Sequence, residues 1–204
     1  ILPELAGAVT VADEALRVVP PASLGGPHLV KVYTPTTTLT TSYTYTATPR
    51  MPTAFEQQVL AEINRRRAVP QTCHRGGANN AMPAVDPVAL AETLPDLALS
   101  HSRDLAARQD RYDGLAHQTW RTSSFSVRFR LGGVTGGPYG EILALSPQGY
   151  TASQVVEQWM GSGSGHCESL MSPTWTKAGV GVAAGVWASG AGPQNSIFSN
   201  VDFR

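Results

Sequence analysis

The strongest constraint on the fold is the order in which two hydrophobic repeats follow each other along the chain. Apolar side chains recur at helical spacing over residues 55–67 and 94–109, whereas residues 177–186 and 197–203 alternate with a period of two. Helical segments followed by paired strands are typical of α+β domains, in which helices pack on an antiparallel sheet. The sequence therefore predicts an α+β fold.

Capping and helix-breaking residues set the expected ends of the helices. Thr53 and Glu56 fit a capping box before the first helix, and Pro70 ends that helix. Pro95 suits the first turn of the second helix, and Ser153 can cap a third. Between these helices we expect a polar loop over residues 73–80, a short helical turn over 87–92 and a Gly-rich loop over 132–140.

Residues 1–51 differ in composition from the rest and form a Thr/Pro-rich N-terminal arm. Thr and Tyr alternate over residues 43–46, and residues 28–33 are a second candidate strand. Two interpretations stay open: a flexible stalk that separates a secreted domain from a cell surface, and a strand hairpin docked on the domain. We assign residues 52–204 to one folded domain.

Charge and hydropathy exclude several classes of partner. The chain has 15 Lys and Arg residues and 15 Asp and Glu residues, so its formal net charge is zero. Nucleic acids and anionic membranes usually recruit a basic surface, so neither is expected as a partner. Among Arg65, Arg66 and Arg67, we expect one to point inward, because adjacent helical residues face different directions. No apolar run reaches the roughly twenty residues that span a bilayer. Because Ile1 is not an initiator Met, we expect a processed chain.

Five segments, in order, resemble the motifs of the CAP superfamily of cysteine-rich secretory proteins, antigens and pathogenesis-related proteins. The last of them resembles a form common in bacterial members. The segments are LAEINRRR at 60–67, LALSHSRDLA at 97–106, GEILA at 140–144, VVEQWM at 155–160 and SGHCESLM at 164–171. The resemblance implies a three-layer α-β-α sandwich in which helices flank an antiparallel sheet.

The same resemblance implies a central cleft with two histidines and acidic residues. The first histidine corresponds to His117, the glutamate to Glu141 and the second histidine to His166, while Ser162 stands where many members have a second acid. Two neutral imidazoles and a carboxylate can bind a divalent metal such as Zn²⁺ or Mg²⁺. They can equally pair with each other, with Glu141 stabilising an imidazolium. No cofactor is required by either arrangement.

Other residues near these motifs have simpler expected roles. We expect His101 to be a packed structural residue, His74 to be solvated and Trp159 to lie in the core. Ile142 replaces the asparagine that usually follows the family's glutamate, which removes an amide from that loop. Glu168 adds a carboxylate that either faces solvent or modifies the cleft.

In the bacterial forms that the chain resembles, cysteines at the places of Cys73 and Cys167 pair. The resemblance therefore implies a Cys73–Cys167 disulfide, whereas the alternative is two free buried thiols. A disulfide would imply an oxidising compartment and hence a secreted, extracellular protein.

The function implied by the resemblance is that of a non-enzymatic extracellular binding module for a small molecule, a lipid or a protein. The alternative is a metal- or serine-dependent extracellular hydrolase that uses the same cleft. Residues 161–165 read Gly-Ser-Gly-Ser-Gly, but neither serine has Gly two positions away on both sides, as a nucleophile elbow requires. A third reading is a structural module that the N-terminal arm attaches to a cell envelope.

Overall fold

A central four-stranded sheet organises the fold. The computed structural model describes residues 9–12, 15–18, 26–33, 38–45, 50–108, 115–118, 125–134, 136–189 and 192–204. The strand order is β7 (Ala89–Leu90), β9 (Lys177–Ser189), β10 (Gly192–Phe203) and β8 (Gly140–Pro147). β10 is antiparallel to both β8 and β9, whereas β7 runs parallel to β9. The predicted α+β class is confirmed.

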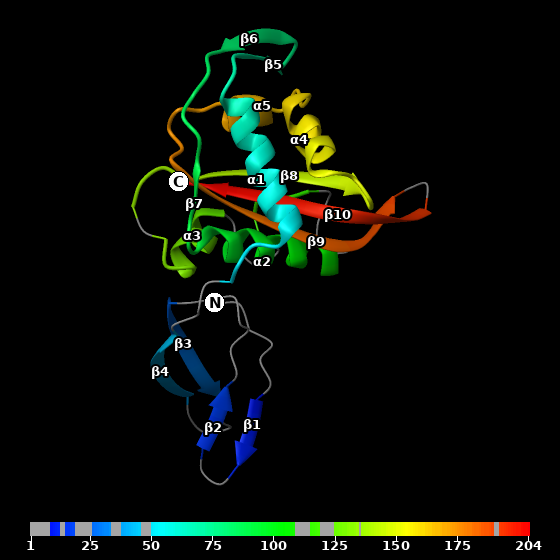
Figure 1. Ribbon diagram of the computed structural model, residues 1–204. Coiled ribbons are helices and arrows are strands. Elements are labelled where there is room, and N and C mark those ends of the chain that lie inside the picture. Colours follow the sequence, from blue (N-terminus) through cyan, green and yellow to red (C-terminus); the bar gives the residue numbers. More distant parts are fainter. Residues whose placement is uncertain are drawn as a thin grey trace.

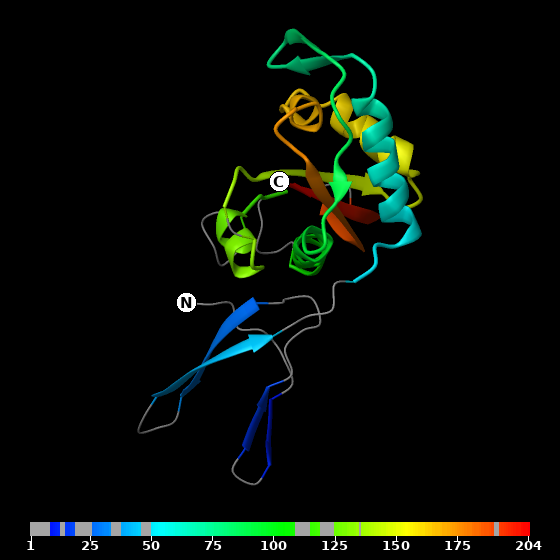
Figure 2. The ribbon, with the colours of Figure 1, turned by 60° about the vertical axis from the view of Figure 1, so that its left-hand side comes forward.

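Helices cover both faces of this sheet, as Figures 1 and 2 show. One face carries α1 (Ala54–Arg67), α4 (Ala152–Met160) and α5 (His166–Leu170), and the other carries α2 (Leu94–Ala107) and α3 (Phe125–Leu131). The largest apolar cluster lies under the first group of helices and includes Trp159, which is 1% exposed. The three-layer α-β-α sandwich is therefore confirmed, and so is the core position of Trp159.

Capping boxes begin two of the helices. Thr53 accepts a hydrogen bond from the Glu56 amide while the Glu56 carboxylate accepts from the Thr53 amide, as predicted, and α1 ends before Pro70. The cap of α4 is Thr151 rather than the predicted Ser153. The Thr151 hydroxyl and the Gln154 side chain satisfy each other's backbone amides, which places Ser153 inside the first turn.

Two segments between the helices differ from the prediction. The expected 73–80 loop is a hairpin of β5 (Gln71–Arg75) and β6 (Ala78–Met82), which turns at Gly76 and Gly77 with φ of 57° and 85°. Residues 87–92 contain the two-residue strand β7 instead of a helical turn. The reason is long-range pairing, because the amides of Ala89 and Ala91 donate to Thr176 and Ala178 at 2.9 Å.

Of the three adjacent arginines, Arg67 is the one that points inward. It is 1% exposed and donates to carbonyl oxygens of Asp86, Leu170, Ser172 and Trp175. Arg65 pairs with Glu62 at the surface. The expectation of one inward contact is confirmed, and Arg67 ties the end of α1 to the chain that follows α5.

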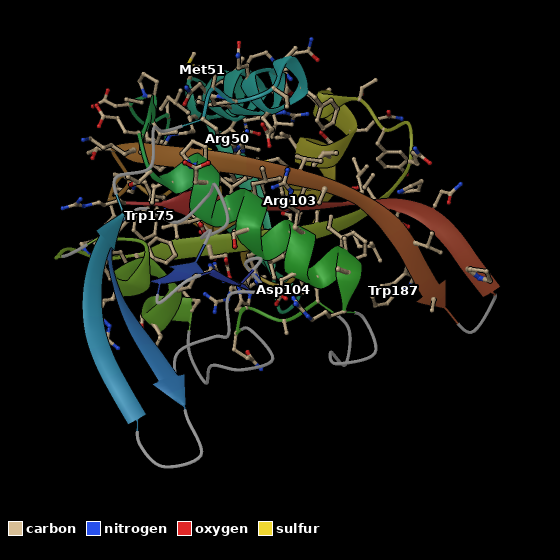
Figure 3. All side chains as sticks on the ribbon, turned by 90° about the horizontal axis from the view of Figure 1, so that it is seen from below. Arg50, Met51, Arg103, Asp104, Trp175 and Trp187 are labelled. Atoms are coloured by element: carbon tan, nitrogen blue, oxygen red, sulfur yellow. A yellow bond between two sulfur atoms is a disulfide. The ribbon has the colours of Figure 1, made fainter. Side chains whose placement is uncertain are left out.

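Close packing joins α2 to the sheet. A Cβ atom on Gly179 would lie 2.2 Å from the carbonyl carbon of Leu94, and one on Gly181 would lie 2.0 Å from the amide nitrogen of Leu99. The Ser102 hydroxyl also donates to the Gly181 carbonyl at 2.8 Å. The helix backbone therefore rests directly on β9, while Arg103 on α2 is exposed to solvent (Figure 3).

Side chains cover the outer edge of β9 where β7 no longer pairs with it. The Val182 amide donates to Glu56 Oε1 at 3.0 Å, and Arg50 Nη2 donates to the Val180 carbonyl at 3.2 Å. Arg50 also forms a two-point ion pair with Glu56, at 2.7 and 2.9 Å. Arg50, which we assigned to the arm, thus contacts the 52–204 domain directly.

The N-terminal arm contains two separate hairpins in the described ranges. β1 (Val9–Ala12) pairs with β2 (Ala15–Val18), and β3 (Gly26–Tyr33) pairs with β4 (Thr38–Tyr45). The two candidate strands of the sequence fall in β3 and β4, apart from Thr46, which lies outside the described residues. Whether the arm is a stalk or docks on the domain stays a prediction.

Candidate functional site

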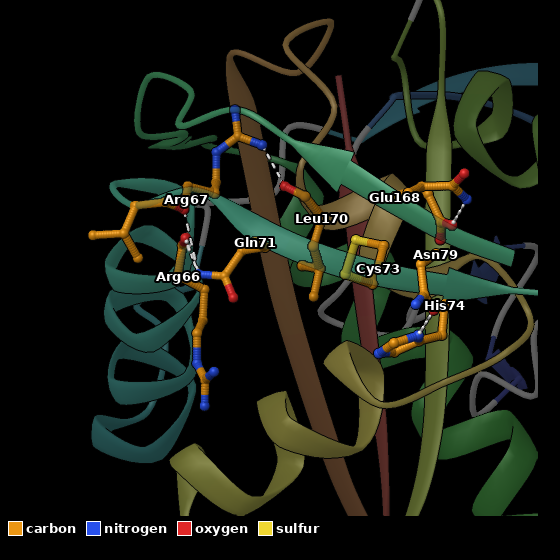
Figure 4. Close-up of a disulfide and its surroundings, with 11 residues drawn as sticks. Arg66, Arg67, Gln71, Cys73, His74, Asn79, Glu168 and Leu170 are labelled. Carbon is orange, nitrogen blue, oxygen red and sulfur yellow. Dashed lines mark hydrogen bonds between the residues drawn. A yellow bond between two sulfur atoms is a disulfide. The ribbon is translucent and has the colours of Figure 1, made fainter.

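A disulfide holds the segment that carries His166. Cys73 of β5 and Cys167 of α5 are bonded, with Cα atoms 5.5 Å apart and both residues buried (Figure 4). The Asn80 amide donates to Glu168 Oε1 at 2.9 Å across the same junction. The predicted disulfide is confirmed. Glu168 contacts the hairpin, so its carboxylate ties β6 to α5.

Glu141 lies at the start of β8 with its carboxylate fully buried. Its Oε1 atom lies 2.9 Å from His117 Nδ1, and its Oε2 atom accepts from Asn200 Nδ2 at 2.9 Å and from Arg128. The register of the sheet explains this environment, because Asp202 of β10 pairs directly opposite Glu141. Both carboxylate oxygens of Glu141 are therefore engaged by donors from other elements.

His117 connects the buried carboxylate to the surface. Its side chain is 48% exposed, while Nδ1 faces Glu141. Glu141 accepts from Asn200 and Arg128 as a carboxylate, so in its contact with His117 the Nδ1 atom is the donor and neutral His117 keeps a lone pair on Nε2. Burial lowers the pKa of His117, and the charge of Arg128 lowers it further, against the opposing effect of Asp202. The ring is therefore neutral at neutral pH.

His166 is half-buried and begins α5 directly after Gly165, whose φ is 89°. Burial lowers the pKa of His166, and the positive charge of His117 lowers it further. The Ser162 hydroxyl accepts a hydrogen bond from the Ser164 amide at 3.2 Å and so stabilises its own turn.

Comparison with known proteins identifies the family. The family model described as "CAP: Cysteine-rich secretory protein family" matches residues 60–185, which is more than half of the chain. The chain belongs to the CAP family. A solved structure, an extracellular protein containing an SCP domain from Bacillus anthracis str. Ames, is 18% identical with a TM-score of 0.47. The match covers 81% of this chain but only 46% of that one, and no curated protein sequence matches.

Three residues around the CAP glutamate were not singled out in the sequence. They are Arg128 of α3, and Asn200 and Asp202 of β10. A signal for the last two was present, because they are polar residues in an alternating strand whose two faces are both covered by helices. Arg128 had no comparable signal, since α3 is short and follows residues without a clear repeat.

Metal binding by His117, His166 and Glu141 is one of the two arrangements that the sequence left open, and it would need oxygens of Glu141 that no other group engages. Among the described residues, no group of three or more His, Cys, Asp or Glu side chains is arranged to hold a metal ion. Glu141 presents no free oxygen to a cation, because His117, Asn200 and Arg128 occupy both of its oxygens. His117 and Glu141 therefore form a hydrogen-bonded set with Asn200 and Arg128.

His101 and His74 have the roles expected of them. His101 is fully buried and bonds to the Ala116 carbonyl at 2.8 Å, and burial lowers its pKa to about 3. His74 is exposed and contacts Asn79. Ile142, next to the glutamate, is 1% exposed and packs in the core. These three residues are not part of the candidate site.

A hollow of about 260 Å³ lies along α1. Its lining residues are Pro52, Glu56, Gln57, Leu60, Ala61, Asn64, Leu90 and Val180. None of the CAP site residues lines it. We place the candidate site at the histidines on chemical grounds, since the hollow offers no imidazole.

No helix in the described part of the chain has the length and apolar character needed to cross a membrane.

The buried acid Asp202 is expected to make stability depend on pH. Burial raises its pKa from 3.8 to about 7, against the lowering effect of Arg128. The folded state therefore keeps a proton that the unfolded state releases, so this contribution is lost as pH rises from about 4 to 7. Relative to Asp202→Asn, the wild type should lose free energy of unfolding over that range in urea titrations. Parallel pH profiles of the free energy of unfolding for the two proteins would contradict this assignment. Subtracting one profile from the other removes the opposite effect of His101, which both proteins share.

Proposed function

We propose that this chain is an exported CAP binding domain whose His117 and His166 side chains contact a small, uncharged ligand without chemical turnover. The ligand would carry a hydroxyl or N–H group and an apolar body. The observation that carries the proposal is the Glu141–His117 contact, because it orients the imidazole with its Nε2 acceptor toward solvent. Attachment to a cell envelope through residues 1–51 is part of the same proposal.

The disulfide supports export. Disulfides persist in oxidising environments and are rare in proteins of the reducing cytosol. Cys73 and Cys167 are buried and bonded to each other, and the described residues contain no free cysteine. An extracellular or otherwise oxidising location is therefore the setting in which this domain would work.

The electrostatics of the histidines support an uncharged ligand. The pKa values of His117 and His166 are both lowered, so both rings are neutral near pH 7. The Glu141 charge behind them is offset by Arg128. His117 also has an aromatic neighbour, Phe125, at a ring-centroid distance of 6.4 Å. A neutral acceptor beside an aromatic ring suits an alcohol with an apolar body better than an ion.

The hydrolase alternative has weaker support. A carboxylate on His Nδ1 is also the arrangement that orients a catalytic base. However, among the described residues no serine or threonine hydroxyl contacts His117, and Ser162 is bonded to its own turn. Serine-dependent catalysis would need a hydroxyl nucleophile at His117, which the described residues do not place there, and metal-dependent catalysis would need an ion to activate water.

The test compares three probes of similar size: 1-octanol, octane and octanoate. We expect wild-type protein to bind octanol about 2- to 10-fold more tightly than octane, which corresponds to one hydrogen bond of about 0.5–1.5 kcal/mol. Octanoate should bind least well, because Arg128, the cation beside Glu141 among the described residues, is buried and already paired. Equilibrium binding by calorimetry or a fluorescent competitor measures the preference.

Matched variants decide whether the histidines are responsible. His117→Ala should remove the preference of octanol over octane, whereas His74→Ala, which changes an exposed histidine elsewhere, should leave it intact. A preference that survives both His117→Ala and His166→Ala would rule out this site. Peptidase or esterase activity that disappears in His117→Ala with folding intact would instead favour the hydrolase.

A further inference from the structure

Arg128 occupies a position in the CAP site that has no counterpart in the sequence motifs. Its side chain is 8% exposed and reaches three other segments of the chain. Its Nη2 atom donates to Glu141 Oε2 and lies 3.3 Å from Asp202 Oδ1, and Nη1 donates to the His117 carbonyl at 3.3 Å. One guanidinium therefore joins α3, β8, β10 and the segment that carries His117.

The two carboxylates beside it require a positive charge. Glu141 of β8 and Asp202 of β10 lie directly opposite each other in the sheet, and both side chains are 0% exposed. Adjacent buried negative charges are costly unless a cation or a proton compensates them. Arg128 supplies a positive charge from within the protein, because its guanidinium contacts both carboxylates.

We infer that Arg128 is the resident cation of this site and that it keeps divalent metals away from Glu141. A metal ion at Glu141 Oε2 would have to displace a buried guanidinium that is held by Glu141, Asp202 and the His117 carbonyl. It would also approach a fixed positive charge, which repels it. The His117–Glu141 pair of this protein is thus metal-independent. This inference does not depend on the ligand proposed above.

Removal of the guanidinium should create the metal site that the wild type lacks. In Arg128→Met, the oxygens of Glu141 and Asp202 lose their shared donor beside His117. An imidazole and carboxylates form a donor set that suits Zn²⁺. We expect Zn²⁺ to bind Arg128→Met at least tenfold more tightly than wild type in calorimetric titrations with zinc chloride. Arg128→Lys keeps a positive charge and should remain close to wild type.

Two controls keep the test decisive. His74→Ala removes an exposed histidine and identifies zinc bound elsewhere, while circular dichroism shows whether each variant is folded. If Arg128→Met fails to fold, Arg128→Met/Asp202→Asn removes one of the two buried charges and is titrated in its place.

The inference is overturned by either of two results. The first is wild-type binding of Zn²⁺ tighter than about 100 µM, near −5.5 kcal/mol, that is lost in His117→Ala or Glu141→Gln. The second is a folded Arg128→Met, or its double variant, with no gain in zinc affinity over wild type. Failure of the octanol experiment would leave both zinc results unchanged, so the two proposals fail separately.

Discussion

Loss of the Cys73–Cys167 bond is expected to lower the free energy of unfolding by up to about 4–5 kcal/mol, because the bond closes a long loop in the unfolded chain. The two cysteines are 94 positions apart, and the bond links β5 to α5. For a domain of this size, such a loss corresponds to a drop in melting temperature of roughly 10–20 °C. The measurement is thermal unfolding of wild type, of Cys73→Ala and of reduced wild type.

The three samples should rank in a specific way. Cys73→Ala should melt close to the reduced wild type, since both lack the same link, and both should melt well below the oxidised protein. Thiol titration of unfolded, unreduced wild type should find no free thiol. Two titratable thiols in that sample would disprove the bridge and remove the main support for export.

The second large effect is expected from Gly181→Ala. The added methyl group would lie 2.0 Å from the Leu99 amide nitrogen and 2.2 Å from the Ala98 carbonyl carbon, both in the backbone of α2. Overpacking of a core usually costs about 1–3 kcal/mol when side chains can move aside. Here the helix backbone itself would have to move away from β9, so we expect a loss of about 3 kcal/mol or more.

A matched glycine provides the control for this prediction. Gly163 has no atom within 4 Å of its would-be Cβ, so Gly163→Ala should change stability by less than about 0.5 kcal/mol. Urea denaturation of the three proteins measures the difference. Equal stability of Gly181→Ala and wild type would show that α2 does not rest on β9 as described.

The parts of the fold that the sequence predicted are those with strong local signals. The capping box at Thr53 and the alternating strands near the C-terminus depend on neighbouring residues, and both were predicted. β7 has only two residues, and its pairing with β9 is decided by residues almost ninety positions away. α5 has only five residues and follows Gly165, whose backbone is left-handed. A helix of this length is too short to show a hydrophobic repeat in the sequence.

The candidate site also contains residues that the sequence indicated and residues that only the tertiary structure reveals. The resemblance to CAP proteins pointed to Glu141 and His117, which are in contact, and to His166, which begins α5. It could not reveal Arg128 or Asp202, because their contacts arise from the pairing of β8 with β10 and from the placement of α3. The sequence left two arrangements open for Glu141, metal ligation and pairing with a histidine. The choice between them depends on the tertiary contacts of the carboxylate, which the sequence does not show.

The Arg50–Glu56 pair on the outer edge of β9 has a consequence for solubility. An open strand edge presents backbone groups that can add a strand from another molecule, which is a common route to aggregation. Here the Val182 amide and the Val180 carbonyl already bond to Glu56 and Arg50. These two side chains therefore occupy the backbone groups to which a strand of a second molecule would bind. A shortened protein that begins at Pro52 would lack Arg50 and leave this edge partly unprotected.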